Sequence, residues 1–366
     1  MSDSLANFYQ TLNAITMWTS RIIPIFQIVF GTFGNICNII IFTRPALRTN
    51  PCSMYFLAGS INNTIAIYFT IFVRYMIEAW NLDITLTSVF ICKVRQYLSS
   101  TAMALCSWFI VLASIDRFLS SSKSVRLRRL SSVSIARKVI ILTIIIMLAL
   151  YSTVLIIYEI AVTYGQRVCT ITSINYFIYY TVEPFIMGVI PVILQSIFGA
   201  LIVLNVRSMH NRVVPIADNA RNERQRSNDR QLVKMHLIQV LIAILLLSPY
   251  AIQVTYYSIT VTMLKRPLPM FDQAIFVFTL NLERFFATTN PVISFYLYTL
   301  TGPKFRSEFK RCIQNGLQVT LTATDLIRYV PIRVQPIVQG GNQTNTTTSQ
   351  PKRTGRGNNV QPIQRQ

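Results

Sequence analysis

Charged residues are scarce in this sequence of 366 residues. They make up 13% of the chain, whereas an ordinary soluble protein has roughly 25%. Hydrophobic residues make up 52%, and they gather in apolar runs of about 20 residues, the length that crosses a bilayer. This composition excludes an ordinary soluble enzyme and indicates a helical membrane protein with several spans.

Acidic residues are fewer still, with 13 Asp and Glu against 34 Lys and Arg, and the formal net charge is +21. In a soluble chain such an excess would suggest binding to nucleic acid. In a membrane protein anionic lipid is the expected counterpart of the basic residues. We therefore expect membrane lipids, and no nucleic acid, among the partners.

Histidine is almost absent, with His210 and His236 as its two instances. Hydrolysis inside a membrane requires paired carboxylates, a serine with a base, or a metal cluster. No two acidic residues form a recognisable motif of that kind. The sequence therefore argues against an intramembrane enzyme, and we expect no cofactor and no bound metal.

Seven apolar segments are long enough to span a bilayer. They are rich in Ile, Val and Leu on every side, as expected of helices in contact with lipid. The predicted fold is an all-α bundle of seven transmembrane helices within residues 22–312. The expected spans are 22–42, 54–77, 94–119, 139–161, 176–204, 232–260 and 271–300.

The basic residues predict the orientation of the bundle. Of the 34 Lys and Arg residues, 25 fall in three alternate loops and in the segment after the seventh span. Such loops face the cytoplasm, so residues 1–21 are expected outside the cell. This segment lacks a basic region and a cleavage site, and the first span is expected to act as its own insertion signal.

The composition changes after Cys312 to Gln, Asn, Thr, Gly and Pro. Such a segment cannot bury a core, and residues 313–366 are predicted to be a disordered cytoplasmic tail. The basic, Phe-containing stretch 305–311 predicts a short amphipathic helix at the membrane surface. Cys312 directly after it is a candidate for palmitoylation.

Two of the six cysteines fall on the predicted outer side. Cys92 lies just before the third span, and Cys169 lies between the fourth and fifth. Because the extracellular compartment is oxidising, we predict that they form a disulfide. The alternative is a pair of free thiols, which would not readily persist there.

A set of motifs occupies matching places in successive spans. Asp116-Arg117 ends the third span, after Cys92, and Gly34-Asn35 lies in the first. Together with Pro191, Pro249 and Asn290-Pro291, these residues resemble a rhodopsin-like (class A) G-protein-coupled receptor over residues 22 to about 312. The resemblance implies a plasma-membrane receptor that binds an extracellular ligand and activates a heterotrimeric G protein. It also implies that Arg117 pairs with Asp116 in the resting state.

Some family positions are altered. Asn63 stands in the second span where the family usually has Asp, which puts sodium modulation in doubt, and Asn35 and Asn63 are expected to serve helix packing. In the seventh span Asn290-Pro291 lacks the family's Tyr at position 294. If the motif is aligned instead to residues 294–298, its Tyr is present as Tyr298, and we prefer this register. It resembles invertebrate neuropeptide receptors of the FMRFamide type.

Residues outside these motifs bear on coupling and on light sensing. Asp229 lies 20 residues before Pro249, where family members often have an acid, so it is a candidate second partner of Arg117. Ser and Thr residues of the tail suggest arrestin as a further partner. No Lys lies between Lys265 and Lys304, which excludes a retinal Schiff base in the seventh span.

Charges placed deep in the spans predict the kind of ligand, because an ionisable residue there usually faces a cavity or a partner. Ser99 replaces the Asp with which amine receptors bind an ammonium, so biogenic amines are not expected. Both signs of charge, with aromatics and amides, favour a short peptide that carries a cationic side chain. A chemosensory receptor for a small molecule and a polytopic transporter are the alternatives. The candidate ligand-binding residues are Arg95, Gln96, Ser99, Glu183, Tyr250, Gln253, Glu283 and Arg284.

Overall fold

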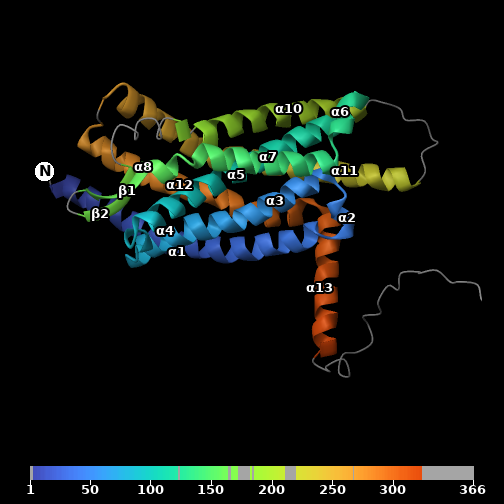
Figure 1. The fold of residues 1–366 in the computed structure, drawn as a ribbon, viewed down its shortest axis with the longest axis horizontal. Helices are drawn as coiled ribbons and strands as arrows, with labels where there is room; N and C mark the ends of the chain where they lie inside the picture. The colour runs from blue at the N-terminus through green and yellow to red at the C-terminus, as the bar shows by residue number, and fades with distance from the viewer. Residues whose placement is uncertain are drawn as a thin grey trace, which may run out of the picture. The chain divides into compact units, whose positions relative to one another are not determined.

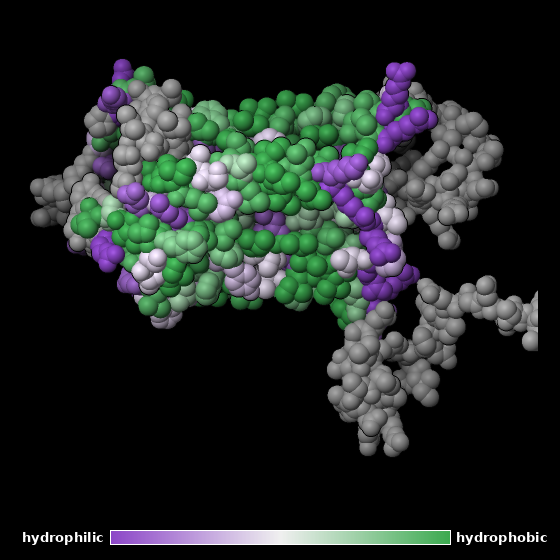
Figure 2. Space-filling view, in the orientation of Figure 1, coloured by the Kyte–Doolittle hydropathy of each residue, from purple (hydrophilic) through white to green (hydrophobic). Residues whose placement is uncertain are grey.

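The computed structural model describes residues 3–122, 124–163, 166–171, 182–183, 185–210, 220–266 and 268–323. The chain divides into two compact units, Met1–Gly316 and Leu317–Gln366. The first unit contains a bundle of long helices lying side by side (Figure 1). Apolar side chains cover its flank between two hydrophilic ends (Figure 2). We refer to these ends by the residues that define them, the Cys92 end and the Arg117 end.

Seven long helical segments form the bundle, which confirms the predicted fold class. Six of them are long and apolar enough to cross a membrane by length and composition. The seventh, α12, has 32 residues and packs against α1, α3 and α11. In chain order the segments are α1 (Asp3–Phe42), α3 (Pro51–Ala66) with η1 (Ile67–Phe72) and α4 (Val73–Trp80), α5 (Val89–Ser121), α7 (Val133–Tyr151) with α8 (Val154–Ile157), η3 (Phe185–Val189) with α10 (Ile190–His210), α11 (Ala220–Tyr257) with η4 (Ser258–Met263), and α12 (Met270–Thr301).

Short elements connect the long helices. At the Arg117 end these are α2 (Pro45–Arg48) and α6 (Val125–Leu130), and α13 (Pro303–Ala323) follows α12. At the Cys92 end they are the 3₁₀ turn η2 (Ile84–Leu86) and the strands β1 (Tyr158–Thr163) and β2 (Gln166–Ile171). The two strands pair antiparallel, with Ile160 opposite Cys169.

Local sequence signals fix several helix ends. The side chain of Asn50 accepts a hydrogen bond from the backbone N–H of Cys52 at the start of α3. Ser88 and Ser132 cap α5 and α7 in the same way. Such caps satisfy backbone donors that a helix start leaves unpaired. Asn81 ends α4 in the left-handed conformation, with φ 55°, which Asn tolerates better than most residues.

The centre of the bundle is α5. In the most apolar 18-residue stretch of α5, 78% of the residues are buried within the protein. The corresponding stretches of the spans that contain α7, α10 and α11 each have 28% buried. The peripheral helices present Ile, Leu and Val outward, as a lipid-facing surface requires. The residues of α5 therefore have the most contacts with other helices, and its two ends carry the sites described below.

Three expected boundaries were wrong. The first helix begins at Asp3 rather than at residue 22; its 40 residues extend about 60 Å, well beyond the hydrocarbon core. The fourth span ends at Ile157 rather than at residue 161, because Tyr158–Thr163 alternates and pairs as a strand. Helix α13 continues to Ala323, so residues 313–323 of the expected disordered tail are helical; residues 324–366 lie outside the described residues.

Candidate functional site

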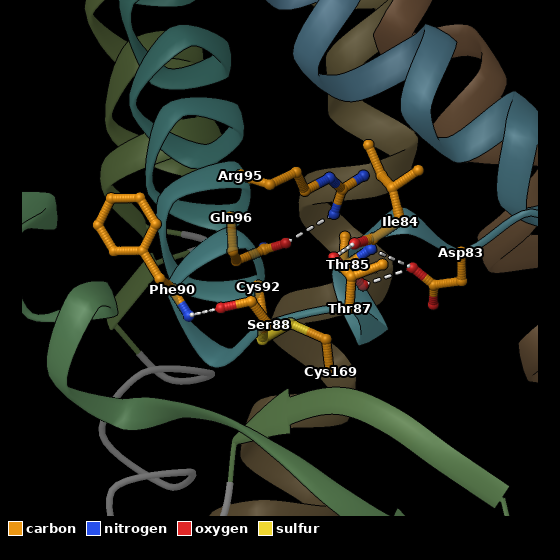
Figure 3. The surroundings of a disulfide bond; sticks show 10 residues. All are labelled: Asp83, Ile84, Thr85, Thr87, Ser88, Phe90, Cys92, Arg95, Gln96 and Cys169. Atoms are coloured by element: carbon orange, nitrogen blue, oxygen red, sulfur yellow. Dashed lines mark hydrogen bonds between the residues drawn. A yellow bond between two sulfur atoms is a disulfide. The ribbon is translucent and has the colours of Figure 1, made fainter.

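A disulfide ties the hairpin to the bundle at the Cys92 end. Cys92 in the first turn of α5 and Cys169 in β2 are bonded, with 5.8 Å between their Cα atoms. The strand β1 also packs against α5, as Figure 3 shows. The predicted bridge is therefore confirmed. It holds the connection between the fourth and fifth spans against the first turn of the central helix.

Two of the candidate ligand-binding residues meet one turn below this bond. Arg95 donates from Nη1 to Gln96 Oε1 at 2.8 Å, as drawn in Figure 3. Gln96 in turn donates to Ser100 Oγ at 3.4 Å. The Nε atom of Arg95 is buried and has no hydrogen-bond partner among the described residues. This short polar run faces inward from α5 and leaves one guanidinium donor unused.

Three other candidates contact neighbouring helices. Ser99 shares a 2.8 Å hydrogen bond with Thr70 of η1. Gln253 donates to the backbone oxygen of Phe276 at 2.9 Å and to Thr279 Oγ1 at 2.8 Å, and so joins α11 to α12. Tyr250 packs in part against buried residues of α5 and η3. In this structure Ser99 and Gln253 therefore use their polar atoms to connect helices.

Three half-buried charges in the half of the bundle near the Cys92 end are not joined to one another. Glu283 has a buried carboxylate oxygen, Oε2, without a hydrogen-bond partner in the described part of the chain. Arg284 donates from Nη1 to Asn281 Oδ1 at 3.3 Å. Glu183 lies next to Tyr151, with which it interacts electrostatically. Among the described residues no ion pair links these three charges, although Arg74 and Glu78 pair at the end of the second span.

A small cavity opens between α1, the η1–α4 segment and α12. Its volume is about 30 Å³, enough for one or two water molecules. Arg284 lines it, and the neighbouring Glu283 does not. Its polar lining combines Gln27, Thr70, Arg74, Glu78, Asn281, Arg284 and Thr288.

A polar network crosses the middle of the bundle between α1, α3 and α12. Asn35 donates to the backbone oxygen of Pro291 at 2.9 Å, and Asn63 donates to Asn35 Oδ1 at 3.4 Å. Gly34 permits this approach, since a Cβ there would lie 2.9 Å from Cβ of Phe295. The two asparagines thus lie where the resemblance implies a packing role.

The lower part of α12 lines a second cavity of about 20 Å³, whose wall includes Asn63, Asn290 and Ser294. Tyr298, also in the wall, is buried and donates to Gln239 Oε1 of α11 at 2.8 Å. The register 294–298 therefore places its tyrosine inside the bundle. Pro249 and Pro291 lie within α11 and α12.

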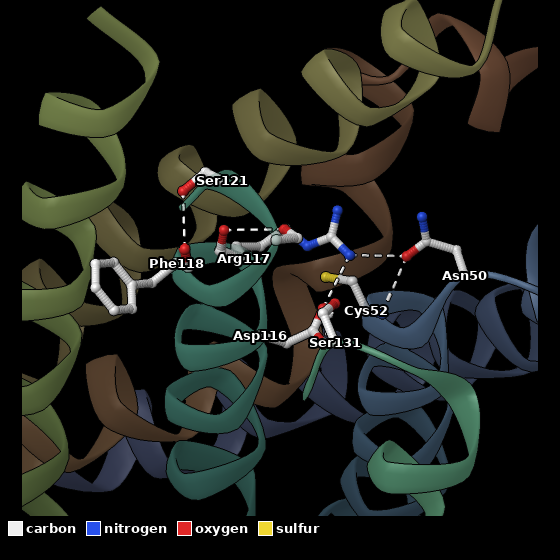
Figure 4. Close-up of polar contacts among 8 residues, drawn as sticks. Asn50, Cys52, Asp116, Arg117, Phe118, Ser121 and Ser131 are labelled. Carbon is white, nitrogen blue, oxygen red and sulfur yellow. Dashed lines mark hydrogen bonds and ion pairs between the residues drawn. The ribbon is translucent and has the colours of Figure 1, made fainter. Parts of the chain in front are cut away.

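The Arg117 end contains a buried ion pair (Figure 4). Arg117 Nη2 lies 2.9 Å from Asp116 Oδ2, and the two side chains are 3% and 5% exposed. The same nitrogen donates to Asn50 Oδ1 at 2.9 Å. Ser131 donates to the other oxygen of Asp116 at 2.8 Å. Arg117 is therefore held between its own helix and the start of α3.

The sequence did not predict the partners of this pair. The signal for Asn50 was present, because Asn followed by Pro is typical of a helix start, but nothing indicated its contact with Arg117. The contact of His236 in α11 was not predicted either. Its side chain is buried and shares a 2.8 Å hydrogen bond with Ser114 of α5. Asp229 lies on α11, and its side chain is outside the described residues.

Helix α13 is attached to the Arg117 end by charge and aromatic packing. Glu308 is buried and pairs with Arg44 at 3.2 Å and Arg311 at 2.9 Å. Cys312 accepts a 2.9 Å hydrogen bond from Arg44 Nη1, and its side chain is half-buried. The start of α13 thus contacts the turn after α1.

A seven-helix bundle with a disulfide at one end and a buried Asp-Arg pair at the other defines a membrane receptor. The family model described as "7 transmembrane receptor (rhodopsin family)" matches residues 34–294, well over half of the chain. The protein therefore belongs to the rhodopsin family of seven-transmembrane receptors, a family of signalling receptors rather than enzymes. A comparison with curated proteins gave no significant match.

Proposed function

We propose that the protein binds a short extracellular peptide at the Cys92 end and activates a heterotrimeric G protein at the Arg117 end. The observation that carries the proposal is the buried Arg117, held by Asp116 and by Asn50 of another helix. A buried cation with breakable contacts is a two-state element whose equilibrium a distant ligand can shift. Pro249, Asn290, Pro291 and Tyr298, in the helices between the two ends, would transmit that shift.

The half-buried acids near the Cys92 end support a peptide with a cationic side chain. Burying a carboxylate oxygen without a partner is costly, and Glu283 Oε2 is such an atom in the described structure. Glu183 is a second acid near the outer end of the fifth span. A Lys or Arg of the ligand would supply the missing charge. With the seventh-span motif aligned to residues 294–298, the sequence resembles invertebrate neuropeptide receptors. This resemblance favours a neuropeptide over other peptides.

Glu183→Gln and Glu283→Gln should each weaken a cationic peptide agonist by at least about tenfold, which corresponds to roughly 1.4 kcal/mol. The reason is that loss of one member of a desolvated charge pair costs about 2 to 5 kcal/mol. Screening peptides in cells with a promiscuous G protein identifies the agonist, and calcium dose-response curves give its potency. Glu159→Gln in the hairpin is a matched control. Unchanged potency in both variants would refute the cationic contact.

A small-molecule ligand is the second candidate. The cavity that Arg284 lines has a volume of about 30 Å³, which suits a compact group better than a chain of several residues. A chemosensory receptor would respond to small molecules in the same calcium assay without any peptide.

We further propose that the Arg117 end faces the cytoplasm. Basic residues in the connections at this end, with Arg126, Arg128 and Arg129 in α6, support this orientation. They would contact anionic lipid headgroups of the plasma membrane. Palmitate on Cys312 would anchor α13, and arrestin would bind the phosphorylated tail.

Engineered glycosylation acceptors test the orientation. An acceptor placed near Asn7 should be modified, while one placed in the connection 123–132 should not, because glycosylation occurs only on the extracellular side of the chain. The measurement is a mobility shift that a glycosidase removes. The opposite pattern would mean that the bundle is inverted.

A further inference from the structure

The cavity between α1, the η1–α4 segment and α12 carries a charge pattern that the peptide proposal does not use. Two guanidinium groups, those of Arg74 and Arg284, line it together with one carboxylate, that of Glu78. Arg74 pairs with Glu78 four residues later. Arg284 therefore faces the cavity as a cation without a carboxylate partner among the described residues.

The nearest polar groups do not neutralise Arg284. Its guanidinium donates to the neutral amide of Asn281 at 3.3 Å. The carboxylate of Glu78 in the same wall is paired with Arg74, and the remaining polar residues, such as Gln27, are uncharged. Arg95 is close enough to Arg74 for the two cations to repel each other. A partly desolvated arginine normally has an anionic partner. Here the cavity offers the place for one.

The backbone of this wall includes one of three π-helical segments among the described residues, with η3 and η4 as the others. The segment Ile67–Phe72 is a π-helix, and its Thr70 and Ile71 line the cavity. A single π-helical turn within an α-helix is rare and occurs often at functional sites. Ile71 and Phe285 add apolar side chains to the lining. The cavity has room for a small charged group such as a carboxylate, and these apolar side chains would contact the part of the ligand next to it.

We propose that this cavity binds a carboxylate of the ligand, and that Arg284 is the residue that recognises it. A planar guanidinium matches a carboxylate in a two-point hydrogen-bonded contact. Adjacent residues on a helix point about 100° apart, so Glu283 and Arg284 serve separate subsites. A short peptide with a cationic side chain and a free C-terminal carboxylate next to an apolar residue satisfies both.

This inference rests on the proposed receptor function, but it has a test that needs no signalling. The full chain is purified in detergent, and its thermal unfolding is followed with increasing 3-phenylpropionate or its uncharged amide, 3-phenylpropanamide. Binding to the folded state raises Tm with concentration. We expect the acid to raise Tm and the amide to have no effect. If the acid has no effect, or if the amide acts equally, the proposal is wrong.

Substitutions locate the effect. Arg284→Gln should weaken the response to the acid by at least about tenfold, and Arg284→Lys should retain part of it because it keeps the charge without the fork of donors. Arg266→Gln, an exposed arginine before α12, is the matched control for net charge. An unaltered response in Arg284→Gln would place the carboxylate elsewhere and overturn the assignment.

A paired peptide library distinguishes a peptide terminus from a small organic acid. Each peptide is made as a free acid and as a C-terminal amide, and both forms are tested for calcium signalling. The free acids should be the active members, and Arg284→Gln should reduce their potency. Active amides would contradict the carboxylate subsite and leave the peptide receptor intact. Signalling by 3-phenylpropionate alone would contradict the peptide and leave the subsite intact.

Discussion

Replacement of either cysteine of the disulfide by serine should lower the amount of folded receptor at the cell surface by at least about tenfold. The bond closes a loop over a sequence separation of 77 residues, for which loop-closure entropy amounts to roughly 4 to 5 kcal/mol. Helices that persist in the unfolded state reduce this value. Even a third of it corresponds to about a tenfold change in the folding equilibrium.

Surface labelling and thermal unfolding in detergent measure the effect. Cys92→Ser, Cys169→Ser and the double variant should be equally impaired, because all three lack the same bond. Cys37→Ser, which alters a free cysteine of α1, should behave like the parent protein. Mass mapping after alkylation without reductant should find neither Cys92 nor Cys169 modified. Two alkylated thiols in surface-expressed protein would contradict the bond.

The bundle and the disulfide could be predicted because each depends on one dominant physical term. Apolar length decides whether a segment crosses a bilayer. Each of the seven expected spans overlaps a long helical segment, although residues 176–181 of the fifth span lie outside the described residues. Cysteine pairs in an oxidising compartment form disulfides, and Cys92 and Cys169 are bonded. Neither prediction required knowledge of which side chains touch.

Helix ends were less predictable because the membrane boundary leaves little trace in the sequence. Helix α1 continues outward from residue 22 to Asp3, since no Gly or Pro interrupts that stretch. Tyr158–Thr163 is apolar enough to extend a span, yet it pairs with β2 as a strand. The disulfide and the strand pairing, which are tertiary contacts, decide that outcome.

The candidate site was predicted as a set of residue types and not as a set of contacts. Gln253 was expected to face the ligand, yet it bonds to α12. The rotation of each helix about its axis decides this, and a segment that is apolar on every side contains no signal for rotation. For the same reason the sequence could not indicate that Arg284 rather than Glu283 lines the cavity beside α1.

The second large effect is expected at the Arg117 end. Asp116→Asn should raise basal signalling at least about tenfold at matched surface expression. Breaking a buried ion pair by removal of one partner costs about 3 to 5 kcal/mol, and this cost falls on the state in which Arg117 stays buried. If G-protein binding releases Arg117 from that environment, about 1.4 kcal/mol of the cost shifts the equilibrium tenfold toward the active state.

Related variants separate the ion pair from general destabilisation. Ser131→Ala removes one hydrogen bond to the carboxylate of Asp116 and should raise basal activity less, since a hydrogen bond to a charged group contributes about 1.5 to 3 kcal/mol. Arg117→Gln should abolish signalling.

Asp229→Ala should raise basal activity if Asp229 is a second partner of Arg117, whereas an exposed pair contributes about 0 to 1 kcal/mol and would change little. Basal nucleotide exchange on the G protein is the measurement. Equal basal activity of Asp116→Asn and the parent protein would mean that the ion pair supports the fold alone. If the pair stabilises the inactive state, removing its negative charge must shift the equilibrium between the inactive and active states.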